Sequence, residues 1–307
     1  MAKNKSQNKS RIGLALGSGS ARGWSHIGVI KALCKMGVEP DIVCGCSIGA
    51  LVGASYCSGN LEKLEDWLLK LTKMEVARFL ELNWSMNGFV DADHLQSFLK
   101  SYVCDEKVSI EDLDKTFAAV STDLEKGREI WFTSGPVLQA VWASMSLPGL
   151  FPPIQNEGRW LIDGGLVNPV PVSICRALGA DIVIAVNLNG DIVGKHLAKK
   201  PEVEVNYGIA DRFIKSIKEY SESIFPENND EEKSPGLFDA IAGSINITQD
   251  RITRSRMAGD PPDILLAPKL SKIGLLEFHR ASTAIEEGGN CVERLSSEIK
   301  YALDIKN

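Results

Sequence analysis

Short apolar runs alternate with segments whose apolar residues recur every three or four positions. The runs Ile12–Leu16 and Ile42–Cys46 have the composition of strands. Each is followed by a helical pattern, over Ser25–Met36 and Ile48–Cys57. The order strand, helix, strand, helix predicts parallel strands that are joined by helices.

The same alternation continues further along the chain. Further strands are predicted at Phe117–Thr122, Glu129–Phe132, Trp160–Ile162 and Ile182–Leu188, with a short helix over Val172–Leu178 that begins just after Pro171. We therefore expect an α/β fold, a three-layer sandwich with a mostly parallel central sheet.

Residues 60 to 102 have a helical pattern instead. Leu61, Leu64, Leu68 and Leu71 fall on one helix face, and Asn60 is a candidate N-cap. We expect these helices to cover the sheet or the mouth of a site. The aromatic stretch Phe79–Phe89 fits plain packing or a mobile cover over an apolar pocket.

The pattern changes after Asn189, where a lysine-containing loop leads into an apolar helical face over Ile209–Ile224. That face, with Arg212, Lys215 and Lys218 nearby, fits core packing or contact with a membrane surface. An acidic stretch, 226–236, predicts a solvated loop, and a strand at Ile264–Ala267 and a helix from Ser282 follow. We predict a flexible leader over 1–10, a core over 11–190, and a mainly helical C-terminal extension over 191–307 that packs on the core as one structural unit.

Composition narrows the classes of function. The 307 residues are 44% hydrophobic and 24% charged, with a formal net charge of −6, which suits a globular protein and argues against a nucleic-acid partner. No run approaches the roughly 18 apolar residues of a membrane span, and the basic N-terminus lacks the apolar run of a secretory signal. Seven cysteines without framework spacing favour a reducing compartment, so we expect a cytoplasmic protein. Cys44 and Cys46 lack a second ligand pair, so we expect no metal site.

A glycine-rich turn follows the first predicted strand and precedes a helix. It reads Gly17-Ser18-Gly19-Ser20-Ala21-Arg22-Gly23. Such a turn presents free backbone N–H groups at a helix N-terminus, which suits an anion. A dinucleotide pyrophosphate and a developing oxyanion both fit that geometry. A dinucleotide site would also need an acidic residue after the second strand, where this chain has Cys46 and Ser47.

The second strand ends in Gly45-Cys46-Ser47-Ile48-Gly49, just before the next helix. A serine on a sharp strand-to-helix turn presents its hydroxyl group to solvent, and glycines two residues before and after it allow neighbouring backbones to approach. The pattern predicts a nucleophile elbow, although glycine-rich turns of this kind also arise without chemistry.

A carboxylate also lies at a strand end, in Asp163-Gly164-Gly165. An aspartate before glycine is often only a turn former. The neighbouring motifs change this interpretation, because the glycine-rich turn, the serine elbow and the aspartate all follow strands of one predicted sheet. Asp163 is therefore the candidate base for Ser47.

Four histidines test the alternative of a Ser-Asp-His triad. The chain order of ordinary α/β hydrolases nominates His196 or His279. Neither of them, nor His94, lies in a strand-end motif. His26 lies on the first turn of the helix after the glycine-rich turn, where it could support that turn.

These motifs together resemble the patatin-like phospholipases, and specifically the bacterial members related to neuropathy target esterase. The segment Ser146–Pro153 ahead of Asp163 is also typical of that group, and the resemblance covers about residues 11 to 190. One departure is that Ser18 and Ser20 alternate with Gly17 and Gly19, where many members have consecutive glycines.

The resemblance implies a serine lipid acyl hydrolase of the phospholipase A or lysophospholipase type, without a cofactor. Ser47 and Asp163 would form a catalytic dyad, and the turn from Gly17 to Gly23 would form the oxyanion hole. The substrate would be a lipid or phospholipid ester, with the protein in the cytoplasm or peripheral to the inner face of the membrane. A nucleotide-phosphate-binding protein and a catalytically silent regulatory member of the family remain the alternatives, and the sequence carries no signal for oligomeric state.

Overall fold

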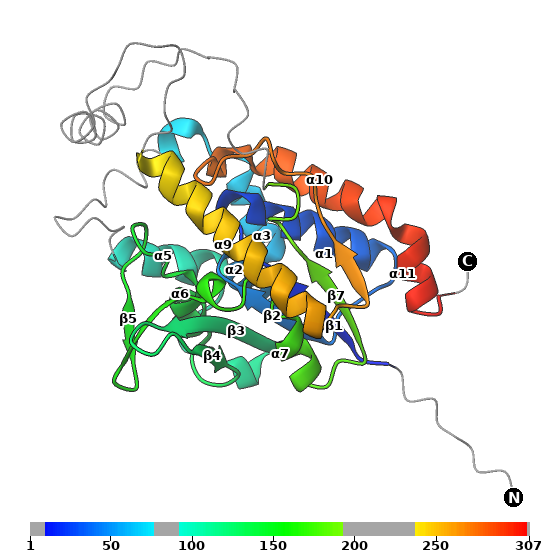
Figure 1. Cartoon of the computed structure of the whole chain (residues 1–307), viewed down its shortest axis with the longest axis horizontal. Coiled ribbons are helices and arrows are strands. Elements are labelled where there is room, and N and C mark those ends of the chain that lie inside the picture. The colour runs from blue at the N-terminus through cyan, green and yellow to red at the C-terminus, as the bar shows by residue number, and fades with distance from the viewer. Residues whose placement is uncertain (1–9, 77–91, 193–236, 306–307) are drawn as a thin grey trace, which may run out of the picture.

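The predicted strands assemble into one sheet in the computed structural model, which describes residues 10–76, 92–192 and 237–305 (Figure 1). The strands are β1 (Ile12–Leu16), β2 (Ile42–Cys46), β3 (Thr116–Asp123), β4 (Glu129–Phe132), β5 (Ile154–Asn156), β6 (Arg159–Asp163), β7 (Ile182–Val186) and β8 (Ile264–Leu266). Their order is β5-β6-β3-β2-β1-β7-β8, and β4 pairs with β3. The path from β3 to β8 is parallel, whereas β4, β5 and β6 are antiparallel to their neighbours. The prediction of a mostly parallel sheet is confirmed.

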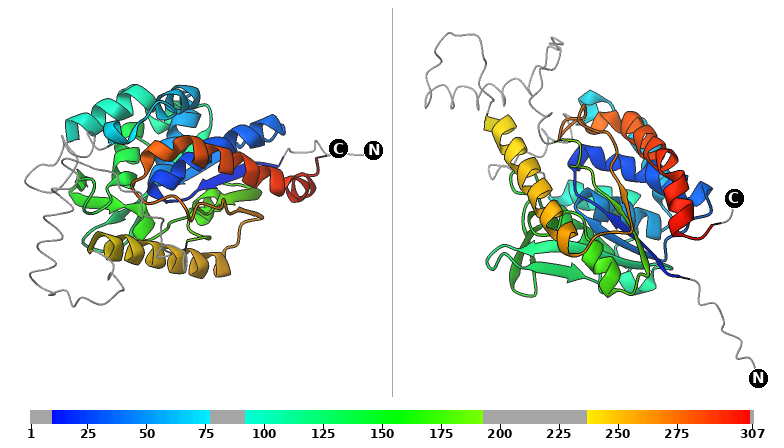
Figure 2. Two further views of the ribbon diagram at one scale, coloured as in Figure 1. Left: turned by 90° about the horizontal axis from the view of Figure 1, so that it is seen from above. Right: turned by 45° about the vertical axis from the view of Figure 1, so that its right-hand side comes forward.

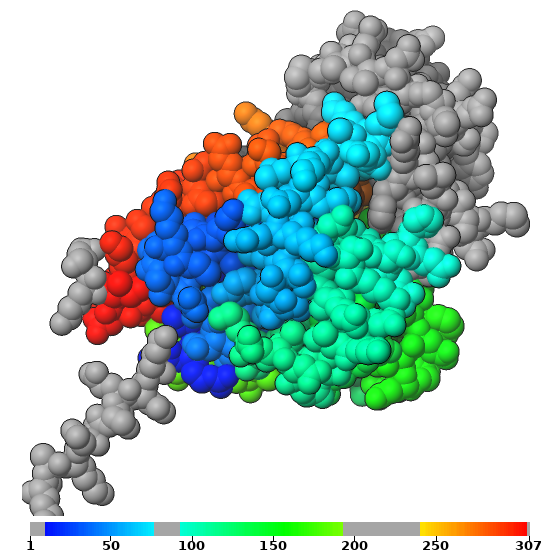
Figure 3. Space-filling model, turned by 180° about the vertical axis from the view of Figure 1, so that it is seen from behind, coloured from blue at the N-terminus to red at the C-terminus, as the bar shows by residue number. Residues whose placement is uncertain are grey.

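Two helical layers enclose this sheet, as the three-layer prediction requires. The helices are α1 (Ser25–Lys35), α2 (Ile48–Cys57), α3 (Leu61–Leu68), α5 (Ala92–Tyr102), α6 (Val137–Met145), α7 (Val172–Ala177), α9 (Leu237–Gly259), α10 (Ala281–Arg294) and α11 (Ser296–Ala302). Figure 2 shows α9 on one side of the sheet, with α1 and α10 on the other. Seen from that second side, α10, α1, α3 and α5 form a continuous surface (Figure 3).

Each face of the sheet has its own apolar core because neighbouring residues of a strand point to opposite faces. Leu14 and Leu16 of β1 pack into the larger cluster, with α1, α2, α6 and α10. Ala15, between them, belongs to the smaller cluster, with Cys44 and the α7 residues Ile174 and Cys175. The buried strands therefore lack an alternating polar pattern, as expected of a sheet that is covered on both sides.

Chain segments beyond residue 190 contribute to the same layers. β8 pairs with β7 at the edge of the sheet, and α10 packs along α1. No helix within the described ranges is long and apolar enough to cross a membrane.

Most predicted elements agree with the structure to within a few residues. Asn60 is the N-cap residue of α3, as predicted, but its side chain makes no capping hydrogen bond, and Asn60 Nδ2 donates to Val103 O, 2.8 Å away. The sequence did not predict α6, α9 or β5. The aromatic stretch Phe79–Phe89, the helical face over Ile209–Ile224 and the acidic stretch 226–236 lie outside the described residues.

The contact between α1 and α10 depends on two glycines that let the helix backbones approach. A Cβ atom at Gly28 would collide with Ile285 O, and one at Gly288 would collide with Ser25 O. At the neighbouring Gly289 the nearest such atom, Gly28 O, would be 4.0 Å from an added Cβ atom.

We predict that Gly288→Ala destabilises the protein by about 1–3 kcal/mol, because the added methyl group forces the two helices apart. Gly289→Ala is the matched control, and should be neutral or stabilising by up to about 1 kcal/mol because alanine favours helix. Urea denaturation of both variants measures the difference. Equal losses in the two variants would contradict the close packing of α1 on α10.

Candidate active site

Ser47 lies on the sharp turn between β2 and α2, with φ 55° and ψ −122°. A positive φ is strained for a residue with a side chain, and such strain is common at functional sites. A Cβ atom at Gly45 would collide with Ala50, and one at Gly49 would collide with Leu16 O. The glycines thus allow the turn to close against the sheet. The Ser47 N–H donates to Ser144 Oγ of α6, at 2.8 Å, which anchors the strained turn from outside.

Asp163 at the end of β6 faces Ser47 directly. Ser47 Oγ donates to Asp163 Oδ2 over 2.5 Å, and the other carboxylate oxygen, Oδ1, accepts from Gly165 N at 2.7 Å. Strand register explains the meeting, since Cys46 pairs with Val120 of β3 while Asp163 pairs with the next residue, Ser121. The backbone of Asp163 is also fixed, because its N–H donates to Ser146 O and its carbonyl oxygen accepts from Thr122 Oγ.

The environment of Asp163 makes its carboxylate a stronger base than usual. Its side chain is almost completely buried, and burial raises the pKa of Asp163 from 3.8 to about 6. The hydrogen bonds from Ser47 and Gly165 oppose this shift by favouring the charged form. Asp163 is therefore ionised at neutral pH, with a proton affinity closer to that of a general base.

The glycine-rich turn leaves two of its N–H groups available. The N–H groups of Gly17, Ser18, Ala21 and Arg22 donate to Val186 O, Pro169 O, Leu275 O and Gly19 O, respectively. Gly23 lies within the 3₁₀ turn Ser20–Trp24. Among the described residues, no acceptor is recorded for the N–H groups of Gly19 and Ser20. Both residues line the same cavity as Ser47 and Asp163.

Arg22 points away from this cavity into the protein. Its side chain is only 1% exposed, and burial lowers its pKa to about 10. Nε donates to Gly19 O at 3.1 Å, and Nη2 donates to Asn246 Oδ1 of α9 at 2.7 Å. The guanidinium group thus holds the glycine-rich turn from behind and does not line the cavity.

Among the histidines, His26 contacts the glycine-rich turn. His26 Nε2 lies 2.8 Å from Gly17 O, and burial lowers its pKa to about 4, so the ring is neutral and Nε2 carries the proton. The ring therefore supports the turn, as the sequence suggested. No hydrogen bond is recorded between Ser47 or Asp163 and the described histidines His26, His94 and His279. His196 lies outside the described residues.

The cavity beside Ser47 is lined mainly by apolar side chains. They come from both helical layers and from the loops around the site, and include Leu51, Trp67, Leu95, Phe98, Met145 and Phe278. The polar residues of the lining are few, and include Ser47, Asp163 and the turn residues Ser18 and Ser20. This arrangement suits an apolar chain that carries one reactive polar group.

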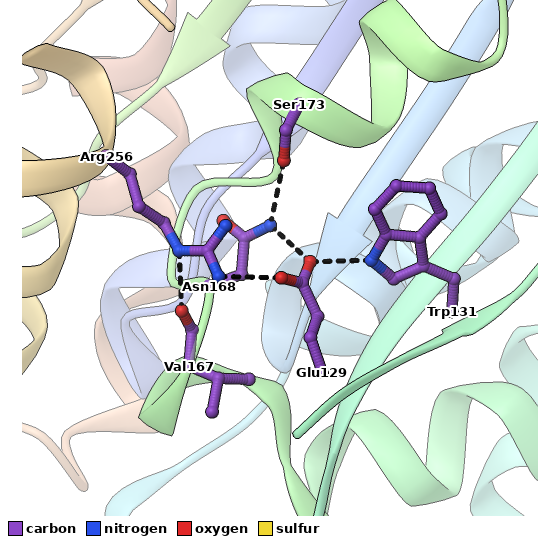
Figure 4. Close-up of polar contacts among 6 residues, drawn as sticks. All are labelled: Glu129, Trp131, Val167, Asn168, Ser173 and Arg256. Atoms are coloured by element: carbon purple, nitrogen blue, oxygen red, sulfur yellow. Dashed lines mark hydrogen bonds and ion pairs between the residues drawn. The ribbon is translucent and has the colours of Figure 1, made fainter. Parts of the chain in front are cut away.

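Polar contacts fix the segment that follows Asp163, at Val167 and Asn168. Arg256 of α9 donates through Nε to Val167 O at 2.7 Å and forms an ion pair with Glu129 over 2.6 Å (Figure 4). Glu129 also accepts from Asn168 Nδ2 and Trp131 Nε1, both at 2.6 Å. A Cβ atom at Gly164 would collide with Val120 O, so this loop packs tightly on β3 as well.

The comparisons with known proteins agree with this architecture. The family model described as patatin-like phospholipase matches residues 14–176, more than half of the chain. The chain belongs to the patatin-like phospholipase family. An uncharacterized NTE family protein of Mycobacterium tuberculosis is 32% identical over 324 residues, which cover 91% of this chain and 89% of the relative.

Two further relatives are much longer than this patatin-like protein. Neuropathy target esterase sws of Drosophila melanogaster is 36% identical over 58% of this chain and 13% of its own length. Lysophospholipase NTE1 of Pyricularia oryzae is 29% identical over 90% of this chain and 18% of its own length. These similarities place the chain among the NTE-related members of the family, as its motifs indicated.

Sequence reasoning missed the residues that support the site from a distance. Ser144, Asn246 and Arg256 contact Ser47 N, the Arg22 side chain and the Asp163 loop, respectively. None of them belongs to a recognisable motif. Only polar residues at positions that face the protein interior could have signalled them, and α9 itself was not predicted.

We predict that Asp163→Asn makes the folded protein more stable near neutral pH. Folding raises the Asp163 pKa from 3.8 to about 6, so the ionised carboxylate costs about 3 kcal/mol above pH 6. Between pH 3.8 and 6 this cost grows, because Asp163 is ionised in the unfolded chain but still protonated in the folded protein. Below pH 3.8 the cost vanishes, because Asp163 is protonated in both states. The asparagine loses part of the gain because its amide has only one oxygen, and so cannot accept from both Ser47 Oγ and Gly165 N as the carboxylate does.

Urea denaturation of the wild type and Asp163→Asn, at a neutral and at an acidic pH, tests this expectation. The variant should be more stable by up to about 3 kcal/mol at neutral pH, and the two proteins should converge in acid. A difference that does not change with pH would show that the carboxylate is not strained by burial.

Proposed function

We propose that the protein is a serine lipid acyl hydrolase. The observation that carries this proposal is the 2.5 Å hydrogen bond from Ser47 Oγ to the buried carboxylate of Asp163, beside two available N–H groups and an apolar cavity. Nucleophile, base, anion site and acyl pocket are then within one enclosure, which is the arrangement that acyl transfer needs.

In the first half of the reaction, Ser47 Oγ attacks the ester carbonyl carbon while Asp163 accepts the hydroxyl proton. The carbonyl oxygen becomes an oxyanion, which the N–H groups of Gly19 and Ser20 stabilise. When the tetrahedral intermediate collapses, the bond to the leaving alkoxide breaks, and Asp163 returns its proton to that oxygen. The alcohol leaves, and the acyl group stays on Ser47.

In the second half, water replaces the alcohol. Asp163 accepts a proton from the water as it attacks the acyl carbon, and the same N–H groups stabilise the second oxyanion. Collapse releases the fatty acid and returns the proton to Ser47 Oγ. Asp163 thus acts as base and acid in turn, which its raised pKa favours.

The substrate class follows from the cavity and the relatives. An apolar lining favours a fatty acyl chain over a polar acyl group. Relatives carry the names lysophospholipase and neuropathy target esterase. We therefore propose phospholipid or lysophospholipid esters as substrates.

A fluorophosphonate probe should label the wild type at Ser47, because an activated serine displaces fluoride from the probe and becomes phosphonylated. Ser47→Ala should lose both the labelling and the hydrolysis of lysophospholipid, and peptide mass spectrometry identifies the modified residue. Ser58→Ala is the control, because it removes a serine hydroxyl group outside the site, and this variant should be labelled like the wild type. Undiminished hydrolysis by Ser47→Ala would refute the proposal, and nucleotide binding without labelling would favour the phosphate-binding alternative.

The rate of hydrolysis should depend on the ionised form of Asp163. We expect kcat to rise with pH to a plateau above about 6, since the protonated carboxylic acid cannot accept the Ser47 proton. Asp163→Asn should lower kcat by about 10²–10⁴-fold, the usual contribution of a positioned general base. His196→Ala and His279→Ala should keep nearly the wild-type kcat.

Rate measurements on variants whose circular dichroism matches the wild type decide this point. A histidine substitution as damaging as Asp163→Asn would indicate a triad, in which Asp163 orients an imidazole group.

A further inference from the structure

Arg22 is the largest side chain that is fully buried in the described part of the chain. A buried cation normally pairs with a carboxylate, because an isolated charge is costly away from water. None of the ion pairs found among the described residues includes Arg22. Its two recorded side-chain partners, Gly19 O and Asn246 Oδ1, are both neutral.

Arg22 pairs with the neutral Asn246 of α9 although carboxylates are available on that helix and near it. Two arginines on α9 itself have acidic partners, Arg254 with Asp250 and Arg256 with Glu129. Asn246 is 7% exposed and points at Arg22 from the middle of α9. Arg22 is therefore an arginine within the glycine-rich turn that has no carboxylate partner in the described part of the chain.

That charge acts on the peptide group that supplies one of the available N–H groups. Gly19 O accepts from Arg22 Nε at 3.1 Å and from Arg22 N at 3.2 Å. The same peptide group carries the Ser20 N–H on its opposite side. Hydrogen bonds to the carbonyl oxygen fix the orientation of this peptide plane and polarise it, which makes the Ser20 N–H a stronger donor.

We propose that Asn246 is a positioning residue of the active site. It anchors Arg22 as a neutral acceptor, so that the guanidinium group orients the Gly19–Ser20 peptide and its positive charge remains available to the oxyanion. This inference rests on the proposed hydrolase function. Because the surroundings of Arg22 are dry, its field is weakly screened and favours the negative charge that develops in the transition state.

An aspartate at position 246 would keep the shape and the hydrogen bond but would neutralise the guanidinium group. Pairing a buried and isolated cation removes an electrostatic cost, so the fold should not lose stability. The oxyanion, however, would lose the net positive field behind the Ser20 N–H. Stability and catalysis should therefore move in different directions, which a purely structural role of Asn246 would not produce.

The experiment compares Asn246→Asp with Thr248→Asp, which adds the same charge to the exposed face of α9. We expect Asn246→Asp to lower kcat for a soluble p-nitrophenyl ester by about 10- to 100-fold, less than the loss of a whole oxyanion donor. KM should stay nearly constant, and the thermal midpoint should be equal to that of the wild type or higher. Thr248→Asp should keep the wild-type kcat. Rates are measured on the alkaline plateau, so that a changed Asp163 pKa does not contribute.

Asn246→Ala provides a second variant in case the aspartate disturbs folding. It removes the anchor of Arg22 Nη2, and we expect a lower kcat per folded molecule with KM nearly unchanged. A wild-type kcat in folded Asn246→Asp, or equal losses in Asn246→Asp and Thr248→Asp, would overturn this inference alone. A wild type without ester turnover or Ser47 labelling would overturn the proposed function, and this inference with it.

Discussion

The hydrogen bond between Ser47 and Asp163 sets the requirements that the rest of the site must meet. A 2.5 Å contact tolerates little movement, and its two ends lie 116 residues apart in the chain. Cys46, which precedes Ser47, and Asp163 pair with the neighbouring β3 residues Val120 and Ser121, so the two strands bring Ser47 and Asp163 to the same level along β3. The strained Ser47 turn and the fixed backbone of Asp163 then remove the remaining freedom. The sheet therefore fixes the distance between the two residues of the proposed dyad, in keeping with the general need for preorganised catalytic groups.

The site also concentrates uncompensated charge. Asp163 is buried without a recorded cation partner among the described residues, and Arg22 is buried without a recorded carboxylate partner. A direct ion pair between them would be more stable, but it would weaken Asp163 as a base and cancel the field of Arg22. The Gly19–Ser20 turn instead contacts Arg22 from one side and lines the cavity of Ser47 from the other. Stability is given up at the place where reactivity is proposed, and the two apolar cores offset the loss.

The sequence predicted the parts of this site that depend on local order. Motifs that follow strands of one sheet were expected to meet, and Ser47 and Asp163 do so. The parallel-strand rule accounts only for Ser47, because β6 is antiparallel to β3, and Asp163 reaches the site because it pairs with Ser121 near the C-terminal end of β3. The sequence could not predict which N–H groups of the glycine-rich turn remain available. That selection depends mainly on acceptors far along the chain, such as Leu275 O and Pro169 O.

Helix α9 was missed for a different physical reason. The residues that it buries include Asn246, Gln249 and Thr253, whereas Ile241 and Ile247 are about half exposed. Periodicity analysis assumes that the apolar face of a helix points inward, and this helix reverses that rule over part of its length. The reversal follows from what α9 contacts, since backbone carbonyls and charged side chains around the proposed active site need polar partners.

This use of α9 bears on how the proposed catalytic centre is divided between the two parts of the chain. Ser47, Asp163 and the glycine-rich turn all lie within the matched residues 14–176. Their supports do not, because Asn246 holds Arg22, Arg256 holds Val167 O, and Leu275 O accepts from Ala21 N. A buried polar group without a hydrogen-bond partner destabilises the fold. In residues 14–176 alone, the Arg22 side chain, Val167 O and Ala21 N would lose these partners. The extension thus supplies contacts that support the proposed active site.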